Sequence, residues 1–322
     1  MRTGAAAGTL GNFHEAAFYG SDDEFLAVVV PFVVDGINAR EPTIVACDDH
    51  YRQLLHDAVG SDAVLNIPRN DSHGRPAATL ASYQRLVRDL VGDGAQQIRI
   101  IGDMAHPGTG NRWNDQWAQL EAVVNEVFGT SPVWTLCPYD TRTTAETVLA
   151  EVLSTHQHIA TADGHHLPNP AFLDPRVFLR TRARYQHPDD GPPNFEMDDP
   201  SPAQARQALA RLCEFSPLTA DRRHDLITTV SEVITNAVKH GCPPVHLRAW
   251  LLDTHCVVRV TDQGSGPADP FVGLVPVDHA DGGEGGFGLW ITNQLCEVDT
   301  LHDDDGYTVH LAVAYGADVA HA

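Results

Sequence analysis

The C-terminal third of the chain carries three short polar motifs in a fixed order, and they limit its possible folds more than any other feature. The first runs from Glu232 to Gly241, the second from Val260 to Gly266 and the third from Gly282 to Leu289. Their patterns predict, in turn, a helix, a strand that ends in a glycine-rich turn, and a glycine-rich loop that opens a second helix.

The first motif places polar side chains along one stripe of a helix. Glu232, Asn236 and His240 are each four residues apart, and the apolar residues between them can bury the rest of the helix. A carboxylate one turn from an amide is typical of a general base beside a metal ligand. Mg²⁺ prefers oxygen ligands and shares its coordination with substrate phosphates. The alternative is a surface helix with polar residues at chance spacing.

The second motif follows an apolar run, Cys256 to Thr261, that is rich in β-branched residues and predicts a strand. Asp262 ends this strand, and Gly264 and Gly266 allow the backbone to approach a flat ligand closely. A buried carboxylate in this place can accept a hydrogen bond from an exocyclic amine such as that of adenine. An ordinary acidic turn is the alternative.

The third motif sets several glycines before the apolar segment Phe287 to Leu295. Backbone N–H groups at a helix start bind anions, so this loop predicts a phosphate site, although it is not a P-loop. Residues 267–281 are rich in Pro, Asp and Gly and predict a mobile lid. Together the three motifs predict a site for ATP with Mg²⁺.

These motifs resemble the N, G1 and G2 boxes of the gyrase, heat-shock chaperone, histidine kinase and mismatch-repair ATPase superfamily. Residues 231–240, 258–264 and 288–291 most resemble its branch of anti-sigma-factor serine kinases. The resemblance covers about residues 194–315. It implies a Bergerat-type α/β sandwich with helices on one face of a mixed sheet.

The resemblance also implies roles for single residues. Glu232 would be the general base, Asn236 the Mg²⁺ ligand and Asp262 the residue that reads adenine. Gly264, Gly266, Gly286 and Gly288 would shape the pocket, and Thr308 would lie near the adenine. Lys239, one turn after Asn236, is expected to help neutralise the phosphates. His240, Gly285 and Leu289 complete the predicted nucleotide-binding residues. The implied function is an anti-sigma factor that sequesters a sigma factor and phosphorylates a serine or threonine of a STAS-type anti-anti-sigma protein. The related kinases are commonly homodimers.

Of three other interpretations, the first is disfavoured and the other two remain open. A histidine kinase would need a phosphoacceptor histidine on a separate helical hairpin, and neither His14, His224 nor the pair His156 and His158 lies in such a segment. Alternatively, ATP is a structural ligand of a non-catalytic sigma-binding module. The third possibility is a stand-alone nucleotide or ligand sensor.

The first half of the chain alternates between strand and helix patterns, which predicts a mostly parallel sheet in a three-layer α/β domain. The expected helices are about 21–38, 51–59, 77–91, 113–128 and 144–153, and the expected strands are 43–47, 63–67, 97–101 and 133–136. In such sheets ligands bind beyond the carboxyl ends of the strands.

This half resembles the MEDS sensory domain of methanogen and methylotroph regulators, on the residues His14, Tyr19, Gly102-Asp103 and Cys137-Pro-Tyr139-Asp140. The family often has a cysteine two residues after its first histidine, where this chain has Ala16. We expect His14, Tyr19, Asp103 and Tyr139 to line a pocket for a small molecule. The alternative is that these residues only cap the sheet.

The predicted organisation is a sensory domain over residues 10–155, a proline-rich linker over 156–192 and an ATPase domain over 193–318. One basic helix is expected within the linker, at about 175–185. Four histidines gather there, His156, His158, His165 and His166, but the segment has no carboxylates at helical spacing. We therefore favour an interpretation without a metal in this segment.

Composition restricts the partners. The formal net charge is −22, which argues against direct contact with nucleic acid because phosphate contacts need clusters of Lys and Arg. No apolar run reaches the roughly twenty residues of a membrane span. The six cysteines include no Cys-x-x-Cys pair, which is typical of a reduced cytoplasmic protein.

Overall fold

The computed structural model describes residues 2–60, 64–67, 76–102, 111–181, 191–275 and 287–315, and it divides into two compact units at residues 183 and 184. The elements of the first unit are η1 (Gly4–Ala6), β1 (Phe13–Tyr19), α1 (Asp22–Ala39), β2 (Thr43–Ala46), α2 (Asp49–Val59), β3 (Leu65–Asn66), α4 (Pro76–Gly92), β4 (Ile98–Gly102), α5 (Asn111–Val127), β5 (Val133–Asp140), α6 (Glu146–Thr155), β6 (His158–Ala160), β7 (His166–Pro168) and α7 (Pro175–Thr181). Those of the second unit are β8 (Phe195–Asp198), α8 (Pro202–Cys213), α9 (Ala220–His240), β9 (His246–Leu251), β10 (His255–Asp262), α10 (Phe287–Leu295), β11 (Glu297–Asp303) and β12 (Gly306–Ala314). None of the helices in these ranges is long and apolar enough to cross a bilayer.

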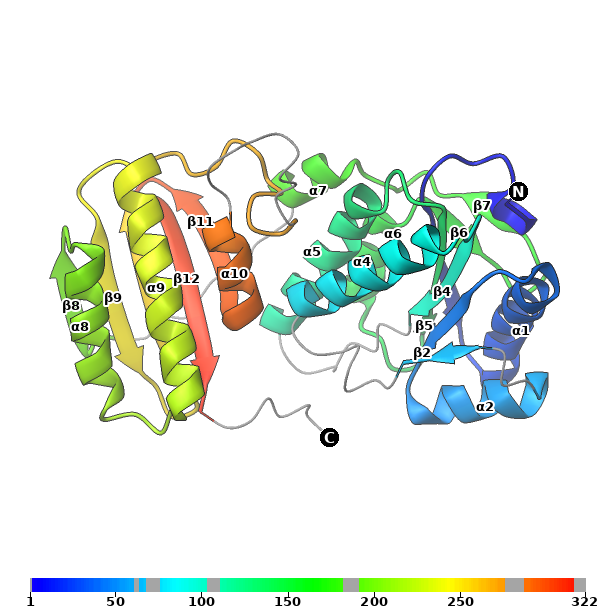
Figure 1. Ribbon diagram of the computed structural model, residues 1–322, viewed down its shortest axis with the longest axis horizontal. Coiled ribbons are helices and arrows are strands. Elements are labelled where there is room, and N and C mark those ends of the chain that lie inside the picture. The colour runs from blue at the N-terminus through cyan, green and yellow to red at the C-terminus, as the bar shows by residue number, and fades with distance from the viewer. Residues whose placement is uncertain are drawn as a thin grey trace. The chain divides into compact units, whose positions relative to one another are not determined.

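The described strands of the first unit form one sheet in the order β3-β2-β4-β5-β1-β6-β7. Every neighbouring pair is parallel except β6 and β7, which confirms a mostly parallel α/β fold. Helices α1 and α2 lie on one side of the sheet and α4, α5 and α6 on the other (Figure 1). The expected start of α1 is confirmed, because the Ser21 side chain accepts a hydrogen bond from the Glu24 N–H.

Strand β1, which the sequence analysis does not predict, lies inside the sheet between β5 and β6. It is buried along most of its length, and its side chains alternate between the two helix layers. Phe13, Ala17 and Tyr19 pack with residues of α1 and α2, whereas Ala16 packs with residues of β5 and α6. His14 and Phe18 share the face of Ala16 by this alternation.

The expected linker over residues 156–192 is wrong for its first part. β6 extends the sheet beside β1, β7 pairs with β6, and α7 packs against α5 and α6. The prolines allow this arrangement because they lie at the ends of short edge elements, where a missing N–H breaks no ladder. The first unit therefore includes residues up to the boundary at 183.

The second unit has a five-stranded sheet in the order β11-β12-β10-β9-β8. All of its described pairings are antiparallel, so the expectation of a mixed sheet is wrong. The turns that join β9 to β10 and β11 to β12 are too short for a parallel crossover, which forces antiparallel pairing. Helices α8, α9 and α10 lie together over one face of this sheet (Figure 1).

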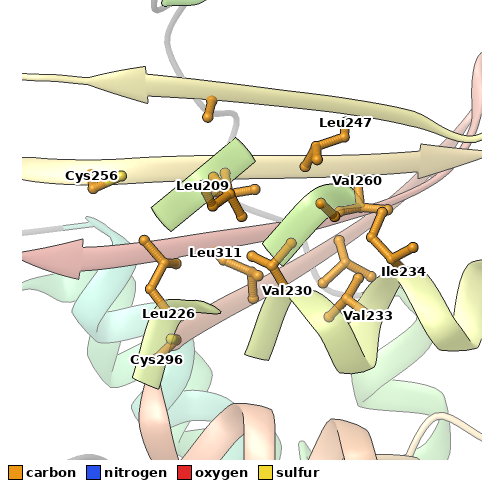
Figure 2. Close-up of a cluster of buried hydrophobic side chains, with 14 of the residues drawn as sticks. Leu209, Leu226, Val230, Val233, Ile234, Leu247, Cys256, Val260, Cys296 and Leu311 are labelled. Atoms are coloured by element: carbon orange, nitrogen blue, oxygen red, sulfur yellow. The ribbon is translucent and has the colours of Figure 1, made fainter. Parts of the chain in front are cut away.

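The core of the second unit lies between these helices and the sheet. Figure 2 shows Leu226, Val230 and Ile234 of α9 facing side chains of the strands, and all three are fully buried. Thr219 caps the start of α9 by accepting a hydrogen bond from the Arg222 N–H. Because the apolar stripe of α9 faces the sheet, its polar stripe is turned toward the neighbouring helices.

Candidate functional site

Glu232 and Asn236 lie on α9 where α10 packs against it. A Cβ atom at Gly288 of α10 would stand 2.9 Å from Glu232 Oε2 and 3.4 Å from Asn236 Nδ2. Only a glycine allows the first turn of α10 to approach these two half-buried side chains so closely. The structure thus brings the first and third motifs together, with a helix start beside a carboxylate and an amide.

Asp262 connects the second motif to the end of the first. It ends β10 with its side chain buried, and its Oδ1 atom accepts hydrogen bonds from the N–H groups of Gly264, at 2.7 Å, and Cys242, at 3.1 Å. Gln263 N–H in turn donates to the Cys242 carbonyl at 2.8 Å. These bonds fix the Asp262 carboxylate beside the C-terminal end of α9.

The turn after Asp262 is held against the last strand. Gly266 has a φ of +68°, and a Cβ atom there would collide with the ring of Tyr307. Tyr307 lies opposite Asp262 in the pairing of β10 with β12 and packs against the core on the helix side of the sheet. The sequence analysis missed Tyr307 because it assigned the role near the adenine to the next residue, Thr308.

Thr308, which the sequence analysis expects near the adenine, is not brought together with these residues. It pairs with Thr261, and the two hydroxyl oxygens are 2.8 Å apart. The alternation of β12 puts Val309 on the helix side, so Thr308 faces away from the helices.

The remaining predicted residues are placed as follows. Leu289 follows Gly288 and packs against the core of the second unit. Lys239 and His240 are exposed in the last turn of α9. Gly285 and Gly286 lie outside the described residues.

The expected lid, residues 267–281, is described only as far as residue 275, and this first part is anchored. Phe271 is buried, and the Asn293 side chain of α10 donates a hydrogen bond to the Gly273 carbonyl at 3.0 Å. The expectation that this segment has few ways to bury itself therefore does not hold for Phe271 and Gly273, which are both buried. The rest of the lid lies outside the described residues.

In the first unit, the expected pocket is only partly assembled. His14 and Tyr139 both contact Glu121: His14 Nε2 lies 3.3 Å from Glu121 Oε2, and the Tyr139 hydroxyl donates to Oε1 at 3.1 Å. Tyr19 faces the other helix layer and packs on the rings of Phe25 and Tyr51, so it is not part of this pocket. Asp103 lies outside the described residues.

Glu121, Cys137 and His156 join His14 in one buried cluster. Burial lowers the pKa of His156 to about 3, with the charge of His14 as a second cause. Burial raises the pKa of Glu121, but the hydrogen bond with His14 and the neighbouring His156 outweigh it and hold that pKa below its ordinary value. The sequence analysis missed Glu121, but one feature could have indicated a buried role for it. Glu121 is an acidic residue in line with the apolar residues Trp117, Val124 and Phe128 at helical spacing.

A cavity of about 50 Å³ adjoins this cluster. His14, Glu121 and Cys137 line one part of it, and the remaining lining is mostly apolar, including Leu80, Ile100, Leu120, Val124 and Phe128.

Comparison with known families assigns each unit. Residues 13–157 match the family described as MEDS, the methanogen/methylotroph, DcmR sensory domain. Residues 195–313 match the histidine kinase-like ATPase domain. No curated protein is significantly similar to the chain.

Proposed function

Since this chain joins a MEDS sensory domain to a histidine kinase-like ATPase domain, we propose that it is an anti-sigma factor with protein kinase activity. In this proposal the sensory domain controls the kinase activity. The two domains make it a nucleotide-binding, kinase-like regulator. The observation that supports the finer proposal is the contact of Gly288 with Glu232 and Asn236, which sets a carboxylate and an amide beside a helix start.

The residues around Asp262 fit an adenine base. Among the described residues, both hydrogen bonds to its carboxylate go to Oδ1, so Oδ2 is the atom that would accept a bond from the exocyclic amine. Gly264 and Gly266 keep side chains away from the turn, and the Tyr307 ring lies beside it. This pocket would hold the base by one charge-assisted hydrogen bond and by flat apolar contact.

Asn236 would contribute an oxygen ligand to Mg²⁺, which neutralises phosphate charge when it is bound. The start of α10 would orient the phosphates, since N–H groups in the first turn of a helix point outward with the positive end of its dipole. Lys239, one turn after Asn236, could add a positive charge at this edge.

Bound ATP would supply the phosphoryl group. Glu232 would accept the proton of a serine or threonine hydroxyl on a STAS-type partner and hold that hydroxyl in line for the transfer. Asn236 stands one helical turn from Glu232, so one helix would position both the base and the metal ligand. The second partner in this proposal is a sigma factor with a basic surface, which the net charge of −22 favours.

Calorimetry with ATP, with and without Mg²⁺, tests the pocket in the Asp262→Asn variant. The amide oxygen of the substituted side chain still accepts both backbone bonds, but the amide nitrogen cannot accept a bond from the base. We expect ATP affinity to fall about 10- to 100-fold, the range for a hydrogen bond to a charged group. Asp253→Asn, at an exposed position, is the matched control. Equal affinity in wild type and Asp262→Asn would remove Asp262 from the site.

Glu232→Gln separates a kinase from a non-catalytic sigma-binding module. A kinase loses phosphotransfer to a STAS protein and keeps its ATP affinity, whereas a module without catalysis has no transfer to lose. Glu214→Gln, an exposed position, is the control. Retained phosphotransfer in Glu232→Gln would show that another group is the base. A pull-down against the sigma factors of the host distinguishes the kinase and the non-catalytic module, which both bind a sigma factor, from a sensor that has no sigma partner.

A further inference from the structure

Four side chains that can bind a metal converge inside the first unit, from four different elements. His14 comes from β1, Glu121 from α5, Cys137 from β5, and His156 follows the last residue of α6. All four are buried, and one donor atom from each lies within 4.8 Å of the other three. The residues are far apart in the sequence, so only the completed fold brings them together.

The distances in this cluster fit the edges of a tetrahedral metal site. His14 Nε2 lies 3.3 Å from Glu121 Oε2, His156 Nε2 lies 3.5 Å from the same oxygen, and Cys137 Sγ lies 3.5 Å from His14 Nε2. Ligands bound to Zn²⁺ at about 2.0 to 2.3 Å stand about 3.3 to 3.8 Å from one another. Three of the six donor pairs therefore already stand at such distances, and the other three are within 4.8 Å, so the donors would only have to draw closer together to surround an ion.

Hydrogen bonds on the far side of His14 fix its tautomer. Its Nδ1 atom lies 3.1 Å from Asn125 Oδ1. The Asn125 amide nitrogen donates to the Thr155 carbonyl at 2.8 Å, which turns the amide oxygen toward His14. His14 therefore donates through Nδ1–H, and its Nε2 presents a lone pair to the cluster when the ring is neutral.

The same argument holds for His156. Its Nδ1 atom lies 2.8 Å from the Val152 carbonyl, which can only accept, so Nδ1 carries the hydrogen. Its Nε2 atom is buried without a hydrogen-bond partner among the described residues, and its lone pair faces Glu121 Oε2. Such an orphaned buried atom is costly unless something unseen satisfies it.

One proton shared among Glu121 and the two histidines satisfies them only in part: on Glu121 Oε2 it would satisfy His156 and leave His14 Nε2 to the Cys137 thiol, a weak donor. A proton on His14 Nε2 would pair with Glu121, but His156 Nε2 would still face a carboxylate oxygen with no donor between them. A metal ion accepts electron pairs from both imidazoles, the carboxylate and a thiolate at once. The Tyr139 hydroxyl on Glu121 Oε1 and Asn125 on His14 then orient the ligands from behind, as outer partners do in metal sites.

We propose that the sensory domain binds one divalent transition-metal ion of the zinc class through His14, Glu121, Cys137 and His156. Two imidazoles, a thiolate and a carboxylate suit Zn²⁺, Co²⁺ or Fe²⁺ and not Mg²⁺ or Ca²⁺, which require oxygen ligands. This metal is separate from the Mg²⁺ proposed for the ATPase domain.

Cobalt substitution of the full chain tests the site directly. After removal of metal by a chelator, Co²⁺ is added, and the absorption of tetrahedral cobalt and of the thiolate-to-cobalt bond is recorded. We expect one equivalent of Co²⁺ with both signals, displacement of Co²⁺ by Zn²⁺, and a higher melting temperature of the first unit with metal. Wild-type protein without the thiolate-to-cobalt signal would overturn the proposal, whatever the variants do.

Variants locate the ion. Cys137→Ser is expected to lose the thiolate-to-cobalt signal, and Glu121→Gln, which keeps the side-chain shape, to weaken Co²⁺ binding at least tenfold. The control is Cys242→Ser, which removes the exposed thiol of the second unit and leaves both signals unchanged. A signal that survives Cys137→Ser and disappears in Cys242→Ser would mean adventitious binding at the surface thiol and refute the assignment.

Discussion

Gly288 makes the closest contact between α10 and the proposed catalytic carboxylate. In Gly288→Ala the new methyl group would stand 2.9 Å from Glu232 Oε2, the flexible end of that side chain. Because a flexible end can move aside, we expect the free energy of unfolding to fall by less than about 1 kcal/mol. The displaced carboxylate should nevertheless reduce phosphotransfer at least tenfold.

The control for this prediction is Gly92→Ala, at the end of α4, where a Cβ atom meets nothing within 4 Å. It should leave phosphotransfer unchanged. A Gly288→Ala variant with full activity would mean that Glu232 needs no fixed position.

His166 gives the first unit a predictable dependence on pH. Its Nδ1 atom lies 2.7 Å from Glu15 Oε2, and this hydrogen bond raises the pKa of His166 against the opposing effects of burial and Arg99. Because the pKa of His166 is higher in the folded state, the protonated side chain stabilises the folded protein. This contribution to the free energy of unfolding is complete below the unfolded pKa of about 6.5. That stabilisation is lost as the pH rises through the folded pKa.

Urea unfolding across this pH window, in wild type and His166→Gln, measures the effect. The difference in the free energy of unfolding between the two should shrink as the pH rises. His165→Gln, whose side chain is mostly exposed, is the control and should follow wild type. A constant difference over the window would show that His166 does not titrate with folding.

At the scale of elements, α9 should respond to mutation according to its two faces. Ile234 is fully buried and Val238, one turn later, is 60% exposed. Ile234→Ala is expected to lower the free energy of unfolding by about 2 to 5 kcal/mol and Val238→Ala by about 0.5 kcal/mol or less. Denaturant titration compares them, and similar losses would contradict the packing of α9 on the sheet.

The helices and strands around the ATPase site could be predicted from the sequence because local patterns encode them. The helix of Glu232 and Asn236, the strand that ends at Asp262 and the helix Phe287–Leu295 are all confirmed. Their apolar periodicity and their glycine punctuation are properties of neighbouring residues, which a sequence displays directly.

Two of the misplaced residues, Tyr19 and Thr308, share one physical cause, the alternation of side chains along a strand. Tyr19 is five residues from His14, an odd spacing, so once β1 is recognised the two must face opposite layers. Thr308 is likewise one residue out of phase with Tyr307, which lies opposite Asp262. β1 itself escaped prediction because His14 and Glu15 are unusual in a buried strand, and only tertiary partners such as Glu121 and Trp134 explain them.

At the scale of the whole molecule, each unit has a core of its own. The core of the second unit draws only on residues between Phe195 and Tyr315. We expect a fragment of residues 184–322 to unfold cooperatively and to bind ATP. Calorimetry compares it with the full chain: tighter binding by the fragment would mean that the sensory domain restrains the site, and a fragment that fails to fold would refute the independence of the unit.

The position of β1 also has a consequence for how the protein is made. The strand leaves the ribosome before every other described strand of its sheet, and both of its neighbours, β5 and β6, are synthesised more than a hundred residues later. Until β5 and β6 are synthesised, β1 remains an unpaired, largely apolar segment. Strand pairing between residues so far apart in the sequence is slow. A nascent chain released before residue 160 would expose this segment, so chaperone capture should peak on chains that end just short of β6.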